Sequence, residues 1–398
     1  NGLEKRPKLR FPGFDEPWEH KELLHYLVEN TDRNKQLKFG KENVLSVSGE
    51  YGIVNQIAFQ GRSFAGESVA DYHVVETDDI VYTKSPLKAK PYGIIKVNNG
   101  VPGIVSTLYA VYHPLKTVVP RFVDFYFSND LRLNKFLKPL VNIGAKHDMK
   151  VNNTFVLTGM VVFPPLREQQ KIVDFLTILD RRIDVQRKKV EALKKYKRGL
   201  LNQIFSAISK GSQRRKLREL VHVSGGKTPS MSNSLYWNGD IVWISSKDMK
   251  SSRISGSELK ITNLALNEMT LYHPGTLLLV ARSGILKHSL PLAILEVDAT
   301  INQDIKALQV HGCNAFYLYY AILSQEDNII RTLVKTGTTV QSLMMDSFLN
   351  IEIPTPDIDQ QQSIIDKLAK LEKYVDVQEK ELSLLSQMRN GLLQQLFI

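Results

Sequence analysis

The feature that most constrains this 398-residue chain is a repeat at one fixed offset. The octet RGLLNQIF at residues 198–205 returns as NGLLQQLF at residues 390–397, an offset of 390 − 198 = 192 positions. The match extends back without a gap to Gln169 in the first copy and Gln361 in the second. Two independent amphipathic helices would share an apolar period but not these identities. The sequence therefore predicts a duplicated unit, each copy ending in a long helix.

Both copies carry an apolar stripe whose steps alternate between three and four residues, as in a coiled-coil seam. The stripe comprises Leu176, Leu179, Ile183, Val190, Leu193 and Leu200 in the first copy, and Leu368, Leu371, Val375, Leu382, Leu385 and Leu392 in the second. Polar residues interrupt it at the same two steps, Gln186 and Lys197 against Gln378 and Arg389, and such residues usually fix register. The first helix is rich in cations and the second leans acidic, which favours their pairing with each other.

The regions before each helix indicate mixed α and β structure. Short β-rich runs bounded by Gly, Pro, Asn or Asp include DDIVYTKS, GIIKVNNG, DIVWISS, GTLLLVARS and PLAILEVD, whereas FVDFYFS and AFYLYYAILSQEDNIIRTL are more helical. A rival offset near 160 links short strand-like strings but fails for the helices. We therefore expect an α+β chain with globular residues 1–163, a helix over 164–208, globular residues 209–353 and a helix over 354–398.

Charge and cysteine content restrict the class of partner. The formal net charge of +11 favours a polyanion, most often a nucleic acid. A single cysteine, Cys313, excludes an internal disulfide and a cysteine-based metal framework, which suits a reducing, cytoplasmic setting. No apolar run approaches 18 residues, so we expect neither a transmembrane span nor a signal peptide.

Catalytic motifs are not recognisable. Lys227 and Thr228 follow a glycine pair, but a phosphate loop needs glycine where Val221 stands, and Pro229 occupies the place where its helix should open. The histidines show no metal-ligand spacing, and no glycine-rich cofactor turn follows a strand. We therefore predict no catalytic residue, no metal and no cofactor, although a nuclease site of scattered acids is not excluded by one sequence.

The polar side chains of the globular regions instead favour nucleic-acid binding. Lys and Arg bind phosphates, while Gln, Ser and Thr bind the edges of bases. The candidate DNA-binding residues are Lys84, Lys88, Lys90, Tyr92 and Lys146 in the first unit, and Lys227, Thr228, Lys247, Arg253, Arg282, Lys287, Thr338, Thr339 and Gln341 in the second.

Four stretches resemble the specificity subunits of type I restriction-modification systems. They are LRFPGFDEPWE from residue 9, PPLREQQKIVDFLTILDRRID from residue 164, SGGKTPSMSNSLYWNGDIVWISSKDM from residue 224 and INQDIKAL from residue 301. The second copy departs from the pattern before its helix, with Asp359 where the first has Glu168 after a register adjustment. We interpret this difference as drift in a structural cap.

The resemblance implies a DNA-reading subunit without catalysis. Two target-recognition domains would each read half of a bipartite double-stranded site, and two long antiparallel helices would form a coiled coil that spaces them with pseudo-twofold symmetry. The helices would dock two methyltransferase subunits, and restriction (motor-nuclease) subunits would join that core. Gly199 and Gly391 would be equivalent points at opposite ends of the helix pair, where a glycine serves either helix packing near a helix end or a surface offered to a partner subunit. Two other hypotheses remain: a DNA-modifying enzyme with an unrecognised site, and a coiled-coil scaffold.

Overall fold

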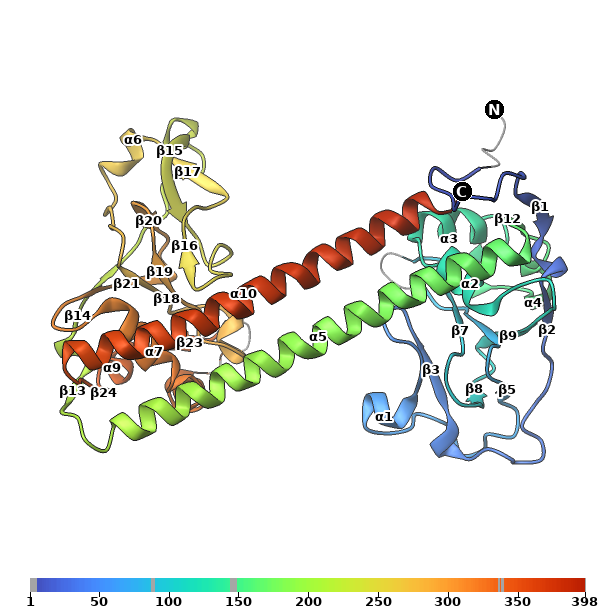
Figure 1. Ribbon diagram of the computed structural model, residues 1–398, viewed down its shortest axis with the longest axis horizontal. Helices are drawn as coiled ribbons and strands as arrows, with labels where there is room; N and C mark the ends of the chain where they lie inside the picture. The colour runs from blue at the N-terminus through green and yellow to red at the C-terminus, as the bar shows by residue number, and fades with distance from the viewer. Residues whose placement is uncertain (1–5, 87–89, 144–148, 336, 338–339, 398) are drawn as a thin grey trace. The chain divides into compact units, whose positions relative to one another are not determined.

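The computed structural model describes residues 6–86, 90–143, 149–335, 337 and 340–397. The chain divides into two compact units (Figure 1). The first unit comprises Asn1–Arg187 with Glu381–Ile398, and the second comprises Lys188–Lys380. Each unit thus contains one globular region and one part of each long helix.

The two long helices are α5, Leu166–Ile208 with 43 residues, and α10, Ile358–Gln395 with 38 residues. At 1.5 Å per residue these helices are about 65 Å and about 57 Å long. Prolines stand just before both, at Pro164 and Pro165 and at Pro356, where a missing N–H costs nothing. The prediction of an α+β fold with two long packed helices is confirmed, since an apolar cluster and several ion pairs join α5 to α10.

The first unit is built on small antiparallel sheets. Its main sheet has the order β2-β9-β6-β7 (Leu27–Glu29, Tyr109–Pro114, Ile80–Thr83, Ile94–Val97). The smaller pairs are β1 with β12 (Glu19–Glu22, Met160–Phe163), β3 with β4 (Leu45–Ser48, Gly52–Asn55), β5 with β8 (His73–Val75, Gly103–Val105) and β10 with β11 (Asn142–Ile143, Met149–Lys150). Its short helices are α1 (Gln56–Gln60), α2 (Pro120–Tyr126), α3 (Asp130–Leu137) and α4 (Asn153–Val156).

The second unit contains a five-stranded sheet of order β14-β21-β18-β19-β16 (Val221–Gly225, Ile305–Val310, Leu277–Val280, Leu292–Leu295, Arg253–Ile254). A second sheet joins β17-β15-β20 (Leu259–Ile261, Trp237–Ile244, Ala299–Ile301), and the pairs are β13 with β24 (Arg214–Lys216, Glu352–Pro354) and β22 with β23 (Val334–Lys335, Ser342–Leu343). Its short helices are α6 (Asn263–Leu266), α7 (Ala315–Leu323), α8 (Glu326–Leu333) and α9 (Met345–Phe348). The five predicted β-rich runs all contain strands, namely β6, β7, β15, β18 and β19.

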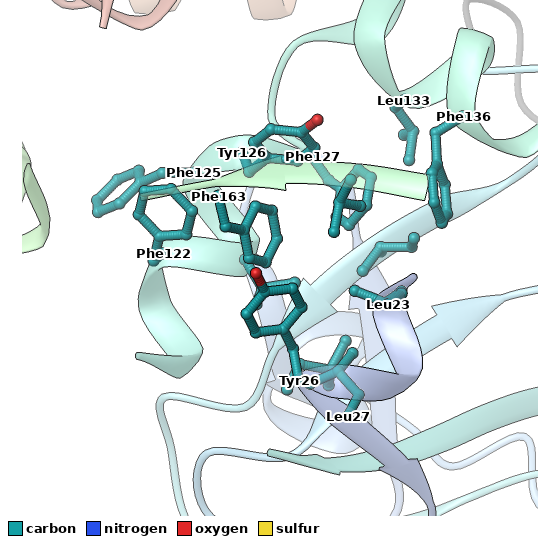
Figure 2. Close-up of a cluster of buried hydrophobic side chains, with 14 of the residues drawn as sticks. Leu23, Tyr26, Leu27, Phe122, Phe125, Tyr126, Phe127, Leu133, Phe136 and Phe163 are labelled. Carbon is teal, nitrogen blue, oxygen red and sulfur yellow. The ribbon is translucent and has the colours of Figure 1, made fainter. Parts of the chain in front are cut away.

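The repeated octets place the ends of the two helices in different cores. Leu393 and Phe397, near the end of α10, belong to the buried core of the first unit, together with residues from the start of α5. Leu201 and Phe205, near the end of α5, belong to the core of the second unit, together with residues from the start of α10. Figure 2 shows the aromatic part of the first core around Phe122. Each helix therefore begins in one globular core and ends in the other.

The duplication is visible in matching hydrogen bonds at the start of each long helix. The Gln169 side chain accepts a hydrogen bond from the N–H of Val119 at 2.9 Å, at the start of α2. The Gln361 side chain accepts one from the N–H of Asn314 at 2.9 Å, at the start of α7. Each amide also donates to the carbonyl of a proline five residues earlier. The repeated glutamine, Gln169 in one copy and Gln361 in the other, thus anchors the start of equivalent helices, α2 and α7.

The start of α5 contains an ion pair, between Arg10 and Glu168, that drift in a structural cap does not explain. The Glu168 carboxylate, 1% exposed, accepts two hydrogen bonds of 2.8 Å from the Arg10 guanidinium. Offset by 192 positions, the second copy has Gln360, which is exposed, as is Asp359. The difference between the copies therefore reflects a partner, Arg10, supplied by the N-terminal segment of the first unit.

Candidate nucleic-acid interface and helix pair

Two of the four polar seam positions, Lys197 and Arg389, form ion pairs between the helices. In the first unit Arg389 of α10 binds Asp180 of α5 through Nε to Oδ1, and through Nη2 to Oδ2 at 3.5 Å. In the second unit Lys197 of α5 binds Glu372 of α10. The two pairs are images of each other, because 180 + 192 = 372 and 197 + 192 = 389. The sequence identified the two cations but not their acidic partners.

The order of contacts shows that the helices are antiparallel. In the second unit Lys194 pairs with Glu379, whereas Lys197, later in α5, pairs with Glu372, earlier in α10. In the first unit Arg182 lies 3.6 Å from Glu381. The basic first helix and the acidic second helix therefore attract each other as their compositions predicted.

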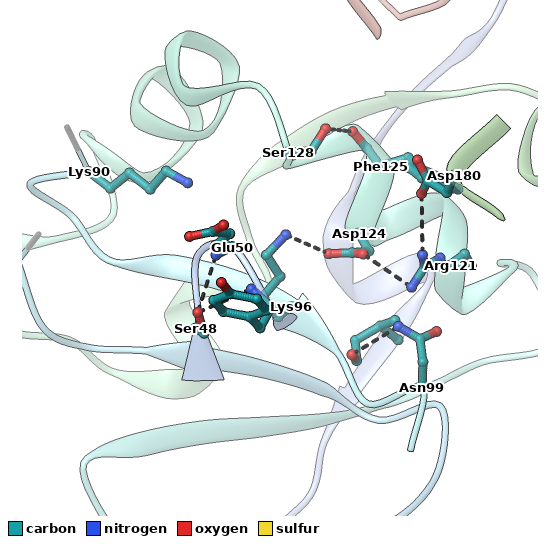
Figure 3. Close-up of polar contacts among 12 residues, drawn as sticks. Ser48, Glu50, Lys90, Lys96, Asn99, Arg121, Asp124, Phe125, Ser128 and Asp180 are labelled. Atoms are coloured by element: carbon teal, nitrogen blue, oxygen red, sulfur yellow. Dashed lines mark hydrogen bonds and ion pairs between the residues drawn. The ribbon is translucent and has the colours of Figure 1, made fainter. Parts of the chain in front are cut away.

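The seam pairs also hold each globular region to its helices. In the first unit a chain of charges runs from Lys96 on β7 to Asp124 at 3.1 Å, then to Arg121 at 3.6 Å and to Asp180 at 3.6 Å (Figure 3). In the second unit the Tyr320 hydroxyl of α7 donates to Glu372 at 3.0 Å. Because one acid serves both the opposite helix and the globular region, the pair fixes the register of all three.

Burial shifts the pKa values of two side chains near Glu372 in the second unit. Burial raises the pKa of Asp376, and the nearby Glu372 carboxylate raises it further. Burial, followed by the same carboxylate, raises the pKa of Tyr320 as well. Both shifts have the same two main causes, burial and the adjacent Glu372 carboxylate.

The twelve predicted apolar seam residues are all buried or partly buried, although Leu176 and Leu368 belong to the two globular cores. Leu176, Leu179, Ile183, Val190, Leu368, Val375 and Leu385 are buried, and Leu193, Leu200, Leu371, Leu382 and Leu392 are partly buried. Leu179, Ile183 and Leu385 form one cluster, with Leu382 and Leu392 packed against it. A Cβ added at Gly199 or Gly391 would meet no atom within 4 Å, so neither glycine serves close helix packing.

Three candidate DNA-binding residues of the first unit have structural contacts. Lys84 is partly buried, donates to Asn153 at 3.1 Å and has its pKa lowered mainly by burial. Lys90 pairs with Asp130 at 3.1 Å. Tyr92 packs against the core, and its backbone carbonyl accepts a hydrogen bond from the Tyr82 hydroxyl. Lys88 and Lys146 lie outside the described residues.

The candidates of the second unit occupy two local groups and three separate positions. Lys227 and Thr228 are exposed, and the Thr228 hydroxyl donates to Gln303, which the sequence analysis did not select although it lies in the INQDIKAL run. The strand bridge between Arg282 and Ser342 brings Arg282 close to Gln341. Lys247 and Lys287 are exposed, and Arg253 pairs with Glu296 at 3.1 Å. Thr338 and Thr339 lie outside the described residues. The DNA-binding role of all these residues stays a prediction.

Both long helices expose apolar side chains away from the seam. On α5, Ile178 and Val185 are 66% and 65% exposed, and on α10, Val377 and Leu384 are 52% and 55% exposed. Each pair is separated by seven residues, which places both members on one helix face. Val185 and Val377 are equivalent in the repeat, since 185 + 192 = 377. Exposed apolar side chains grouped on one face are typical of protein–protein interfaces.

Two kinds of site are not found in the described part of the chain. No group of three or more His, Cys, Asp or Glu side chains among those residues is placed to hold a metal ion. Across the same residues, no helix combines the length and the apolar character that a membrane crossing needs.

Comparison with known structures defines the class of fold. The chain is similar to the crystal structure of a type I restriction-modification S subunit from M. genitalium, with a TM-score of 0.60 and 14% identity over 99% of each chain. It is also similar to a chain from a structural study of type I R-M complex assembly, with a TM-score of 0.54 and 17% identity over 98% of this chain and 99% of that one. These matches establish the fold.

The sequence comparison then gives the family. Residues 66–195 and 209–387 match the type I restriction modification DNA specificity domain, and the chain belongs to that family. It is 38% identical over 160 residues to the EcoR124I/EcoR124II specificity subunit of Escherichia coli, covering 39% of this chain and 40% of that protein. It is 30% identical over 190 residues to the MjaIX specificity subunit of Methanocaldococcus jannaschii, covering 46% and 43%. The chain thus matches less than half the length of these two relatives.

Proposed function

We propose that this chain is the non-catalytic specificity subunit of a type I restriction-modification complex in the cytoplasm. Each globular region reads one half of a bipartite DNA site, and the helix pair sets the spacing between the halves. The observation that carries this proposal is the duplication itself. The family pattern matches twice, and the same glutamine and ion-pair contacts recur at an offset of 192 positions.

A duplicated reader suits a two-part site because an internal twofold repeat presents two equivalent surfaces to a duplex. A helix pair of about 60 Å equals the axial rise of about 18 base pairs at 3.4 Å each. The net charge of +11 supports binding to the phosphate backbone.

The same symmetry supports a partner assignment. The exposed apolar faces of α5 and α10 carry an equivalent pair, Val185 and Val377, so one kind of partner can bind both in the same way. We assign these faces to two methyltransferase subunits, with the restriction subunits joining through that core. Substituting Val185 and Val377 with Asp should release the methyltransferase in a pull-down, whereas Asp at only one of them should release a single copy.

Spacing is the sharpest test of the proposal. One heptad is inserted in each helix at equivalent places, after Val190 and after Leu382, which lengthens the pair by about 10 Å or about three base pairs. Methylation-site sequencing of a host carrying the variant and its methyltransferase should reveal the same half-sites with a longer spacer. Altered half-site bases with an unchanged spacer would show that the helices do not act as the ruler.

Two further results would replace the proposal. Methylation of DNA by the purified chain alone, supplied with S-adenosylmethionine, would make it an enzyme. Uniformly weak affinity for every duplex, even with the methyltransferase present, would make it a scaffold.

A further inference from the structure

A hollow of 440 Å³ lies in the first unit beside the two long helices. Its lining includes four basic residues, two acidic residues and two neutral polar residues of α10, which are Lys90, Lys96, Arg187 and Arg389, then Glu50 and Asp180, then Ser386 and Asn390. Figure 3 shows the side of the hollow that carries Lys90, Glu50 and Lys96.

Three of the four cations are neutralised by nearby carboxylates. Lys90 pairs with Asp130 at 3.1 Å, Lys96 pairs with Asp124 at 3.1 Å, and Arg389 pairs with Asp180. These three residues therefore have little charge to offer a ligand.

Arg187 is different. Its ion pair is with Asp184, one turn earlier on the same helix, at 4.0 Å, and its side chain is 56% exposed. A same-helix contact at that distance neutralises little of the charge in water. Arg187 is thus the least neutralised cation of the hollow.

Two α10 residues that line the same hollow add neutral polar groups to it. Asn390 is exposed, and its amide makes no hydrogen bond to the residues that the structure describes, so its N–H donors are available. Ser386 donates its hydroxyl to the Leu382 carbonyl at 2.9 Å. Guanidinium and amide N–H groups both donate hydrogen bonds to phosphate oxygens, so a hollow lined by both is suited to an anion.

In the second copy of the repeat, the positions equivalent to Arg187 and Ser386 form an ion pair with each other. Arg187 corresponds to Glu379, because 187 + 192 = 379, and Ser386 corresponds to Lys194, because 386 − 192 = 194. Glu379 and Lys194 form an ion pair with each other. The first unit therefore lacks this ion pair between the helices and has an exposed cation where the second unit has an acid.

We propose that Arg187 and Asn390 bind one backbone phosphate of the DNA in this hollow, on the part of the helix pair that belongs to the first unit. The inference rests on the proposed function and adds to it a positioning contact outside the globular regions. Phosphate contacts fix register on a duplex without reading bases, so the contact sets where the DNA lies.

The test uses the chain in complex with its methyltransferase and a duplex carrying the site found by methylation sequencing. Arg187→Gln should weaken binding about tenfold, the size of one charge-assisted contact. It should also reduce the slope of log affinity against log salt by about one. In a scan of single uncharged methylphosphonates along the duplex, one position should weaken the unmodified protein about tenfold and leave the Arg187→Gln protein unaffected.

Two further variants separate this contact from general charge effects. Arg181→Gln removes an exposed cation of α5 that does not line the hollow, and it should change affinity less than twofold. The double variant Arg187→Glu with Ser386→Lys introduces the ion pair of the second copy, and it should lose the contact while keeping its thermal unfolding midpoint.

Several outcomes would overturn the inference. The first is an equal effect of Arg187→Gln and Arg181→Gln on affinity. The second is a methylphosphonate scan that is identical for the unmodified and the Arg187→Gln proteins. The third is a rise in the unfolding midpoint with inorganic phosphate alone that depends on Arg187, which would assign the hollow to a free anion. In each of these cases the unmodified complex still prefers its site over a scrambled duplex. Loss of that preference in the unmodified complex would instead refute the proposed function.

Discussion

Phe397 offers the most direct test of how the helices end. It is 3% exposed, and its ring lies 5.4 Å from Phe122, 6.1 Å from Tyr126 and 6.5 Å from Trp18. The Arg132 guanidinium also stacks over it at 5.3 Å. The last turn of α10 is therefore part of the first core, although most of α10 precedes it in the second unit.

The perturbation is Phe397→Ala. Removing a buried phenyl ring costs about 3–5 kcal/mol in most cores. We expect about 3 kcal/mol here, because a residue beyond the end of a helix relaxes more readily than one held on both sides. That figure corresponds to about a 150-fold increase in the opening equilibrium of the first unit.

Hydrogen exchange measured by mass spectrometry resolves the two units separately. Amides of α2 and of the last turns of α10 should exchange about 150-fold faster in Phe397→Ala, and amides of the second unit should be unchanged. Phe205→Ala is the matched control, since Phe205 is 4% exposed and lies 5.5 Å from Tyr317 in the second core. It should give the reverse pattern. Faster exchange in both units from either variant, or no change in the first unit from Phe397→Ala, would refute the assignment of the helix ends.

The remaining predictions concern buried charges. Glu372→Gln should lower the free energy of unfolding by about 3 kcal/mol in urea titrations, because it leaves Lys197 without its carboxylate; a double-mutant cycle with Lys197→Met should show strong coupling, and simple additivity would contradict the seam pair. Arg10→Met should cost about 3 kcal/mol in the first unit, because Glu168 is left buried and unpaired, and an unchanged unfolding midpoint would show that the pair is not needed. Burial lowers the pKa of His73 from 6.5 to about 4, so the unfolded chain takes up this proton first as the pH falls. The resulting stability is present above pH 6.5 and is lost as the pH falls from 6.5 to about 4, and His73→Gln should flatten the stability profile in that window relative to the unmodified protein.

Patterns that are local in the sequence were predicted well. The strands β6, β7, β15, β18 and β19 and the helices α2 and α7 follow from short runs of apolar residues bounded by turn residues. The seam follows from a heptad period, which a helix converts directly into a face. The family resemblance, later confirmed, rested on contiguous motifs of the same kind.

Candidate DNA-binding residues were predicted less specifically, because a lysine in a sequence does not reveal its partner. Lys84 and Arg253 are engaged with Asn153 and Glu296, which no spacing argument brings near them. Arg187 was not selected, since it looks like one more cation on a basic helix. Its distinction appears only when its neighbours on α10 are known.

The sequence by itself determined that the protein is duplicated, that each copy ends in a long helix, and where the faces of those helices lie. These properties depend on identities at one offset and on a helical period, both of which are read along the chain. The tertiary structure alone decided that each helix begins in one globular core and ends in the other. It also decided that Arg389 pairs with Asp180, 209 positions away, and that Glu168 pairs with Arg10, 158 positions away. Such contacts join segments that are distant in sequence, and their free energy depends on burial and geometry that exist only once the chain has folded.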